Sequence, residues 1–422
     1  MSDKPIVTII GAGRSGRGML GEMFYQEKNY SIVFADIDTG LVQGLAEQGY
    51  YTVEQKNLLT GKSRESIVKG FQIVDTVNDH LKYITYLARS EMIATALFPS
   101  AFDQVAEDLA EMIRMRKEQK NDSTAAIILG GNFVGLRQYF DKKISGSLDE
   151  DELDYFKKHI ALITAKVNRK VVYPEVCRKD PYFLEGDDKD ILMVDNSFLF
   201  PDGYQYPSFF VLKDNMEINM IEKIWSENLR HVTFAFMGTY YGYQTINQAV
   251  NNLYIRKCSY YAWKEGRLAL NEEYGLPVPD DEAVKVEFEK FASPFFRDQL
   301  SRIGREPIRK LKKNDRLVGP ALLCMKHRII PYFITRSIAY GMFYQDQNDK
   351  EAVELQNYIS DHGIERAITH FCELDMDDVM ENSLFHLILC NYNEIAKTNI
   401  IPINENVTYT NCQKITFVVQ SV

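Results

Sequence analysis

Long apolar runs are absent from this sequence. No stretch of eighteen consecutive apolar residues occurs, so nothing in it is typical of a transmembrane helix. The first residues, MSDKPIVTII, lack the basic and apolar segments of a secretory signal and enter a strand pattern at once. We therefore expect a cytoplasmic protein that does not associate with membranes.

Cysteine and positive charge are also scarce. The six cysteines, at positions 177, 258, 324, 372, 390 and 412, form no C-x-x-C pair, which argues against a disulfide framework or a zinc site. Lys and Arg total 49 against 59 Asp and Glu, a net charge of -10. Because nucleic-acid-binding proteins present basic surfaces, this balance argues against nucleic acid as a partner. We predict reduced thiols and no metal.

The chain length and the N-terminal pattern predict a two-domain protein that begins with an α/β fold. Its 422 residues exceed what one hydrophobic core usually supports. In the first third, short apolar runs alternate with amphipathic stretches such as AFDQVAEDLAEMIRMRKEQKN, as in βαβ units. PIVTII, YSIVFAD and TAAIILGGN are typical of buried parallel strands, as is either YITYLA or the neighbouring EMIATAL. We predict an N-terminal Rossmann domain with a doubly wound sheet.

The pattern changes near residue 190. The segment CRKDPYFLEGDDKDILMVDNSFLFPDG is irregular and acidic, and from about Asn215 to Lys397 the periodicity is mostly helical. The end, NENVTYTNCQKITFVVQSV, alternates like one or two strands. We therefore predict a Rossmann domain at residues 1–200, a mostly α-helical substrate domain at 201–400 and an extended tail at 401–422.

A glycine-rich turn follows the first strand. In VTIIGAGRSGRG the glycines have the G-x-G-x-x-G spacing that lets backbone N–H groups approach a diphosphate at a helix N-terminus. Asp36 ends the second strand, where a carboxylate binds the ribose hydroxyls of NAD and repels the extra phosphate of NADP, a preference that Arg14 could soften. The alternative is a glycine turn that binds no ligand. The predicted cofactor-binding residues on this domain are Gly11, Gly13, Arg14, Ser15, Gly16, Asp36 and Thr95.

A lysine, an asparagine and a histidine lie close together in IEKIWSENLRHVTFAFMG. At 100° per residue, Lys223, Asn228 and His231 fall at about 0°, 140° and 80° around a helix axis, so one broad face presents all three. A desolvated lysine serves as a general base, and the other two side chains hold an alcohol or carbonyl oxygen. On spacing alone, ordinary surface and core-edge residues are the simpler interpretation.

These segments together resemble the long-chain polyol dehydrogenase (mannitol dehydrogenase) family. The resemblance rests on GAGRSGRG, ILGGNFVG, the Lys-x4-Asn-x2-His spacing, GYQTI and DQLSRIGREPIRKLKKNDRLVGPALL, and it is weakest at residues 173–203. It implies a Rossmann domain, a helical substrate domain and metal-independent, NAD-linked oxidation of a secondary alcohol. In that family's pattern Lys223 would be the general base, Asn228 and His231 would hold the reacting oxygen, and Asn132 would lie near the nicotinamide.

A basic block follows residue 300. Seven basic residues lie between Arg302 and Arg316, against only Glu306 and Asp315. Arginine and lysine bind phosphomonoesters well, so a phosphorylated sugar fits this block better than a free polyol. The alternative is a solvated basic turn, which most charge runs are. The candidate phosphate-binding residues are Arg305, Arg309, Lys310 and Arg316.

The sequence thus predicts an NAD-dependent enzyme whose partner is a small sugar or sugar phosphate. We expect it to interconvert a sugar-alcohol phosphate and a keto-sugar phosphate, of the mannitol 1-phosphate and fructose 6-phosphate type. One alternative is a relative that acts on an unphosphorylated polyol or a hexuronate, as mannitol 2-dehydrogenase or tagaturonate reductase does. A less favoured alternative is a non-catalytic nucleotide-sensing protein. The pattern leaves open whether the chain is a monomer or a dimer.

Overall fold

The chain folds into two compact units. The computed structural model describes residues 4–131, 133–174, 176–196, 205–295 and 297–397. The first unit comprises Met1–Glu227 and Pro279–Arg297, and the second comprises Asn228–Val278 and Asp298–Val422. The boundary predicted at residue 200 lies outside the described residues, and the chain divides after Glu227 instead. The predicted tail at 401–422 also lies outside them.

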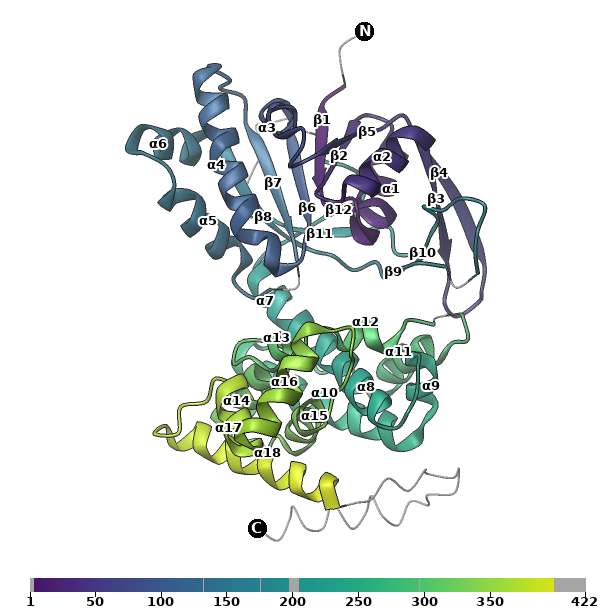
Figure 1. The fold of residues 1–422 in the computed structure, drawn as a ribbon, viewed down its shortest axis with the longest axis vertical. Coiled ribbons are helices and arrows are strands. Elements are labelled where there is room, and N and C mark those ends of the chain that lie inside the picture. Colours follow the sequence, from purple (N-terminus) through teal and green to yellow (C-terminus); the bar gives the residue numbers. More distant parts are fainter. Residues whose placement is uncertain (1–3, 132, 175, 197–204, 296, 398–422) are drawn as a thin grey trace. The chain divides into compact units, whose positions relative to one another are not determined.

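The first unit is built on an eight-stranded sheet in the order β12-β11-β8-β7-β6-β1-β2-β5 (Figure 1). Six neighbouring strands, from β8 to β5, are parallel, and β11 is antiparallel to β8. From β1 the chain adds β2 and β5 toward one edge of the sheet. From β6 it adds β7, β8, β11 and β12 toward the other edge, so the strand order reverses between β1 and β6. Ligands of doubly wound folds bind at the carboxyl ends of such strands. The strand bounds are β1 (Ile6–Ile10), β2 (Ser31–Asp36), β5 (Gln72–Asp75), β6 (Met92–Ala96), β7 (Ala125–Gly130), β8 (Ile160–Lys166), β11 (Leu192–Asp195) and β12 (Phe210–Lys213).

Apolar side chains cover both faces of this sheet, which confirms the predicted doubly wound domain. One core cluster joins the sheet to η1 and α1, and the other joins it to α3, α4, α5 and α6. The alternative between YITYLA and EMIATAL is resolved, since the first lies in α3 and the second supplies β6. The helices of this part are η1 (Gly16–Gly21), α1 (Glu22–Glu27), α2 (Thr39–Gln48), α3 (His80–Arg89), α4 (Phe102–Glu118), α5 (Leu136–Gly146), α6 (Glu150–His159) and α7 (Met216–Glu222).

A second, four-stranded sheet in the order β4-β3-β10-β9 was not expected from the sequence. It consists of β3 (Tyr50–Lys56), β4 (Ser63–Lys69), β9 (Val171–Val172) and β10 (Leu184–Asp187). The segment interpreted as irregular therefore contains both β10 and β11. That interpretation was wrong because LEGD and LMVD are short and end in an acid, and their extended form depends on pairing with distant β3 and β8.

The second unit is helical, as predicted. Its longest helix, α10, is capped by the Asn252 side chain at its start and by Gly275 at a φ of 67° at its end, and it packs against α8, α14 and α15. No described helix is long and apolar enough to cross a membrane. The helices are α8 (Leu229–Tyr240), α9 (Ile246–Asn251), α10 (Leu253–Tyr274), α12 (Leu300–Gly304), α13 (Pro307–Leu311), α14 (Val318–Lys326), α15 (Tyr332–Met342), α16 (Lys350–His362), α17 (Ile364–Phe371) and α18 (Val379–Lys397), while α11 (Asp281–Ala292) belongs to the first unit.

Candidate active site

The glycine turn lies at the carboxyl end of β1. Gly11 has a φ of +97° and donates its N–H to the Ala35 carbonyl at 2.8 Å, so this position needs glycine. A Cβ on Gly16 would lie 1.8 Å from the Gly11 carbonyl oxygen, so a side chain there would disrupt the turn itself. A Cβ on Gly13 would meet nothing within 4 Å. Contacts within the protein therefore account for the glycines at positions 11 and 16, whereas Gly13 faces open space that a ligand could occupy.

Asp36 lies beside this turn at the end of β2. Its Oδ2 accepts the N–H of Ala12 at 2.6 Å, and its Oδ1 accepts the N–H of Asp38 at 3.0 Å. Each carboxylate oxygen keeps a further lone pair for a hydroxyl donor. Two exposed apolar side chains follow the same pair of strands, Ile37 after β2 and Val77 after β5, with 72% and 62% of their surfaces exposed. The arrangement suits a nucleoside, with a carboxylate for the ribose and apolar surface for a base.

The carboxylate next to Asp36 in the sheet is already saturated. Asp75 pairs with Asp36 across β2 and β5, and it accepts hydrogen bonds from Thr39 Oγ1 at 2.6 Å and from two groups of Asn78. The Thr39 hydroxyl makes the largest contribution to a pKa of Asp75 well below its usual range. Asp75 therefore fixes the loop after β5, and Asp36 retains lone pairs for a ligand.

Three of the other predicted cofactor residues lie near the turn, with different surroundings. The Arg14 guanidinium lies 5.5 Å from the centre of the Tyr173 ring, and Ser15 precedes the π-helix η1. Thr95, at the end of β6, is buried, and its hydroxyl accepts the Gly130 N–H at 3.1 Å and donates to the Ile128 carbonyl at 3.4 Å. These bonds hold β6 to β7, so the structure gives Thr95 a role inside the sheet. Asn132 lies outside the described residues.

Lys223 is a buried amine. It begins a single turn of π-helix, η3 (Lys223–Asn228), and 6% of its surface is exposed. Its Nζ donates to the carbonyl oxygen of Val167 at 2.6 Å, just after β8. A neighbouring amine, Lys166 Nζ, instead meets the Glu227 carboxylate at 3.3 Å. The backbone after β8 therefore fixes the position of the Lys223 ammonium group.

The π-turn changes the predicted spacing of the three candidate residues. Hydrogen bonds in a π-helix join residues five apart, which is the separation of Lys223 and Asn228, so the angles calculated for an α-helix do not apply there. Asn228 is buried, and its Nδ2 has no hydrogen-bond partner among the described residues. His231 follows in α8 and is half-buried. An orphaned buried amide donor is costly unless a ligand accepts its hydrogen.

Most of the basic block is paired with carboxylates. Arg309 Nε donates to Glu306 at 2.8 Å and its Nη1 to Asp315 at 3.1 Å, while Arg302 pairs with Asp298. Lys312 and Lys313 pair with Glu373 and Glu381. Arg305 is exposed and lies 3.9 Å from Glu306. With Arg316, which pairs with Asp315, six of the seven charges therefore lie within 4 Å of an acid of the second unit.

Lys310 and Arg316 differ from the rest because both are buried with donors to spare. Lys310 is 4% exposed, and its Nζ lies 3.5 Å from the Glu306 carbonyl oxygen. Burial, reinforced by Arg309 and Arg316, holds the pKa of Lys310 well below its ordinary value. Arg316 is 6% exposed and donates from Nε to Asp315 at 2.7 Å, but its Nη2 has no hydrogen-bond partner among the described residues. Burial also lowers the pKa of Arg316. This pair suits an anionic ligand.

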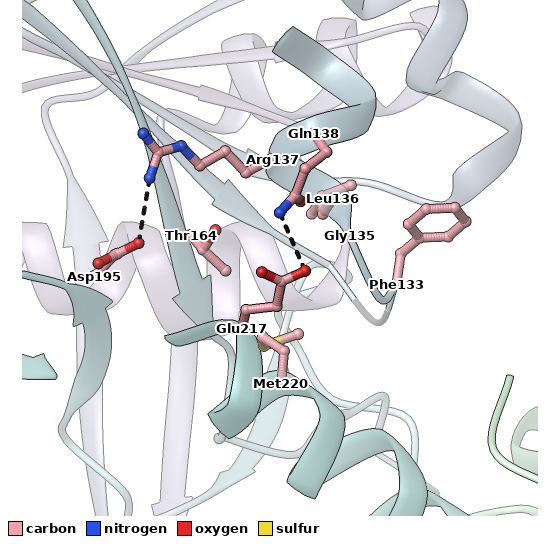
Figure 2. A pocket seen from close by; sticks show the side chains of 9 residues that line it. All are labelled: Phe133, Gly135, Leu136, Arg137, Gln138, Thr164, Asp195, Glu217 and Met220. Carbon is pink, nitrogen blue, oxygen red and sulfur yellow. Dashed lines mark hydrogen bonds and ion pairs between the residues drawn. The ribbon is translucent and has the colours of Figure 1, made fainter. Parts of the chain in front are cut away.

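A small pocket in the first unit adjoins the helix that leads to Lys223 (Figure 2). It has a volume of about 60 Å³ and opens between the start of α5, β8 and α7. Gln138 donates to Glu217 at 3.1 Å, and Arg137 lies 3.6 Å from Asp195, as Figure 2 shows. Met220, three residues before Lys223, also lines it. No pattern in the sequence indicates this pocket, because its residues come from four separate segments.

Two family profiles match the chain. The Rossmann domain of mannitol dehydrogenase matches residues 5–193, and the mannitol dehydrogenase C-terminal domain matches residues 218–382. Among curated proteins, the chain is 25% identical over 391 residues to mannitol-1-phosphate 5-dehydrogenase of Buchnera aphidicola subsp. Acyrthosiphon pisum (strain Tuc7), covering 92% of this chain and 98% of that one. It is 27% identical to the enzyme of the same name from Oceanobacillus iheyensis, covering 88% of this chain and 94% of that one.

Solved structures share the fold. The mannitol 2-dehydrogenase of Pseudomonas fluorescens, in a ternary complex with NAD and D-mannitol, matches with a TM-score of 0.77 at 12% identity, covering 100% of this chain and 95% of that one. A D-sorbitol dehydrogenase in substrate-free form matches with a TM-score of 0.70 at 13% identity, covering 94% of each chain.

The doubly wound sheet with its glycine turn and the helical second unit define a Rossmann-type dehydrogenase. The chain belongs to the mannitol dehydrogenase family, since the two profiles cover most of its length. It is thus an oxidoreductase acting on CH–OH groups, and the family predicted from the sequence is confirmed.

Proposed function

We propose that this enzyme interconverts a sugar-alcohol phosphate and a keto-sugar phosphate, of the mannitol 1-phosphate and fructose 6-phosphate type. The observation that carries the proposal is the buried pair Lys310 and Arg316, whose spare donors suit a phosphate group. Guanidinium and ammonium groups bind phosphate through charge-assisted hydrogen bonds. Relatives named mannitol-1-phosphate 5-dehydrogenase, aligned over most of the chain, support the same substrate class.

In the proposed mechanism Lys223 is the general base. Its Nζ already lies at hydrogen-bond distance from one acceptor, the Val167 carbonyl oxygen, which orients the amine without neutralising it. In the neutral form, Nζ accepts the proton of the substrate hydroxyl, and in the reverse reaction it returns that proton. NAD, which the glycine turn and Asp36 would hold, would supply the hydride acceptor or donor. This chemistry requires no metal.

Asn228 and His231 hold the reacting oxygen in this proposal. The spare Nδ2 hydrogen of Asn228 is directed to the oxygen on which negative charge develops during reduction of the ketone. His231, one turn into α8, supplies a second polar group near the same helix. Hydrogen bonds donated to this oxygen would strengthen as the negative charge grows.

The glycine turn and Asp36 fit the adenosine half of NAD. We expect Asp36→Ala to reduce the preference for NADH over NADPH by about tenfold or more, because one carboxylate both accepts the ribose hydroxyls and repels a phosphate. The measurement is kcat/KM for each cofactor. The matched control is Asp103→Ala, an exposed acid on α4 that pairs with Lys143, and it should leave the ratio unchanged. An unchanged ratio in Asp36→Ala would show that Asp36 does not contact the ribose.

The substrate class is tested by following NADH absorbance with fructose 6-phosphate, fructose and tagaturonate. We expect fructose 6-phosphate to give the highest kcat/KM by at least about 100-fold, since only it carries a phosphate for Lys310 and Arg316. Faster turnover of fructose would favour the function of the structural neighbour named mannitol 2-dehydrogenase. If the protein binds NADH but none of the three compounds causes its oxidation, the enzyme acts on another substrate. If the protein does not bind NADH, the alternative of a non-catalytic protein is favoured.

A further inference from the structure

A buried arginine, Arg17, lies next to the glycine turn. Arg17 follows Gly16 in η1, and 1% of its surface is exposed. Among the described residues, no carboxylate lies within 4 Å of its guanidinium nitrogens. Burial lowers the pKa of Arg17, although a guanidinium remains protonated at neutral pH. Asp36 and Asp180 act on this charge electrostatically, but neither forms an ion pair with it, and a buried charge without such a pair costs folding free energy.

The contacts of Arg17 hold it against the turn. Its Nε donates to the Ala12 carbonyl oxygen at 2.6 Å, and its Nη1 donates to the Tyr182 carbonyl oxygen at 2.9 Å. The guanidinium also lies 5.5 Å from the centre of the Tyr51 ring and 5.8 Å from that of Tyr182. The side chain is therefore fixed in direction, with its charge close to the backbone of the glycine motif.

Both backbone groups of Ala12 are fixed by side chains. The N–H donates to Asp36 Oδ2 at 2.6 Å, and the carbonyl accepts from Arg17 at 2.6 Å. In a planar trans peptide the carbonyl and the following N–H point in opposite directions. The Gly13 N–H therefore points away from Arg17, at the one glycine of the motif where a Cβ would meet nothing.

We propose that Arg17 is a positioning residue for the cofactor diphosphate. It orients the Ala12–Gly13 peptide so that the Gly13 N–H is available to the diphosphate. The inference rests on the NAD-binding function. Arg17 would thus contribute to cofactor binding although it is not one of the three motif glycines.

The second sheet explains how this arginine is kept in place. Tyr51 lies on β3, and Tyr182 precedes β10, which packs against η1. Asp180 anchors this segment by accepting the Thr52 N–H at 2.7 Å and the Tyr182 N–H at 2.8 Å. The hydroxyl of Tyr51 also donates to the Arg17 carbonyl at 3.0 Å. The segment that resembles the family least thus supports the cofactor turn.

The test compares ligands with and without a diphosphate. Binding of NADH, ADP and adenosine to the full chain is measured by calorimetry for the wild type, Arg17→Gln and Arg17→Lys. We expect Arg17→Gln to weaken NADH and ADP binding about 10- to 100-fold, the range for one charged hydrogen bond, and adenosine binding less than about twofold. Arg17→Lys should fall between, because it keeps the charge and loses the planar fork. KM for NADH should rise more than kcat falls.

The matched control is Arg116→Gln. Arg116 is also 1% exposed and also donates to backbone carbonyls, those of Ala88 and Ser123, but it lies on α4, in the part of the core that the glycine turn does not enter. Its replacement should lower the melting temperature and leave the ratio of ADP to adenosine affinity unchanged. If Arg17→Gln also leaves the ratio of ADP to adenosine affinity unchanged, the inference is overturned. If the Gln variant does not fold, the same result in Arg17→Lys overturns it. A wild-type protein that binds no NADH would overturn the proposed function as well.

Discussion

Replacement of Lys223 by alanine should lower kcat about 100- to 10,000-fold, the range that a general base contributes. The expected loss is confined to the chemical step, because Nζ contacts the Val167 carbonyl and the proposed hydroxyl rather than the glycine turn. NADH affinity, measured by fluorescence titration, should change less than about threefold. Turnover near the wild-type value would remove Lys223 from the mechanism.

The conservative variant Lys223→Arg separates chemistry from packing. A cation remains that can still donate to the Val167 carbonyl, but a guanidinium does not release its proton in this pH range. We therefore expect Lys223→Arg to be as inactive as Lys223→Ala while its melting temperature stays closer to the wild type. A lysine that only supports the fold would be rescued by arginine in both measurements.

Replacement of Lys310 by methionine should raise KM for fructose 6-phosphate about 100-fold. Removing one partner of a desolvated charged contact costs roughly 2–5 kcal/mol, and about 2.8 kcal/mol corresponds to a factor of 100. The free protein should lose little stability, because the buried Nζ contacts one carbonyl oxygen at 3.5 Å, and the effects of Arg309 and Arg316 on its charge outweigh those of Glu306 and Asp315. Loss of substrate affinity together with an unchanged or higher melting temperature would be the signature of a ligand site.

Fructose and Lys312→Ala are the controls for this prediction. KM for fructose should not change in Lys310→Met, since fructose has no phosphate. Lys312, two residues away, is exposed and pairs with Glu373, so its removal should change KM less than about twofold. If Lys310→Met and Lys312→Ala affect fructose 6-phosphate equally, the basic block is a solvated turn.

The pH dependence of stability gives a further check on Lys310. Because burial lowers its pKa in the folded protein, the unfolded chain binds more protons between the folded-state pKa and the ordinary lysine value. The contribution of Lys310 to unfolding free energy therefore rises with pH through that window. Denaturant titrations at several pH values should show this rise in the wild type and a flatter profile in Lys310→Met.

The strands around the cofactor turn could be predicted because their chemistry is local. β1, β2 and β7 are short, apolar and rich in branched residues, so burial on both faces follows from the sequence itself. The glycine turn could be predicted for the same reason, because the requirement for glycine at Gly11 and Gly16 comes from steric contacts close to the turn itself. YITYLA was ambiguous because a short apolar run suits a strand or a buried helix face equally well.

The surroundings of single charged residues could not be predicted. Lys310 and Lys312 are chemically identical and two positions apart, and which one is buried depends on how α15 and α16, later in the chain, pack against α13. Arg17 looks like a polar residue at the edge of a loop until Tyr51 and Tyr182 cover it. Likewise, nothing in KIWSEN distinguishes a π-turn from an ordinary helix.

We propose that this chain transfers hydride between NAD and the carbonyl carbon of a keto-sugar phosphate. The most direct test uses NADH deuterated at both C4 positions of the nicotinamide, with fructose 6-phosphate and purified protein, followed by mass spectrometry and NMR of the product. We predict a sugar-alcohol phosphate with deuterium on the former carbonyl carbon. NADH oxidation without deuterium in the product, or no sugar-alcohol phosphate at all, would contradict the account.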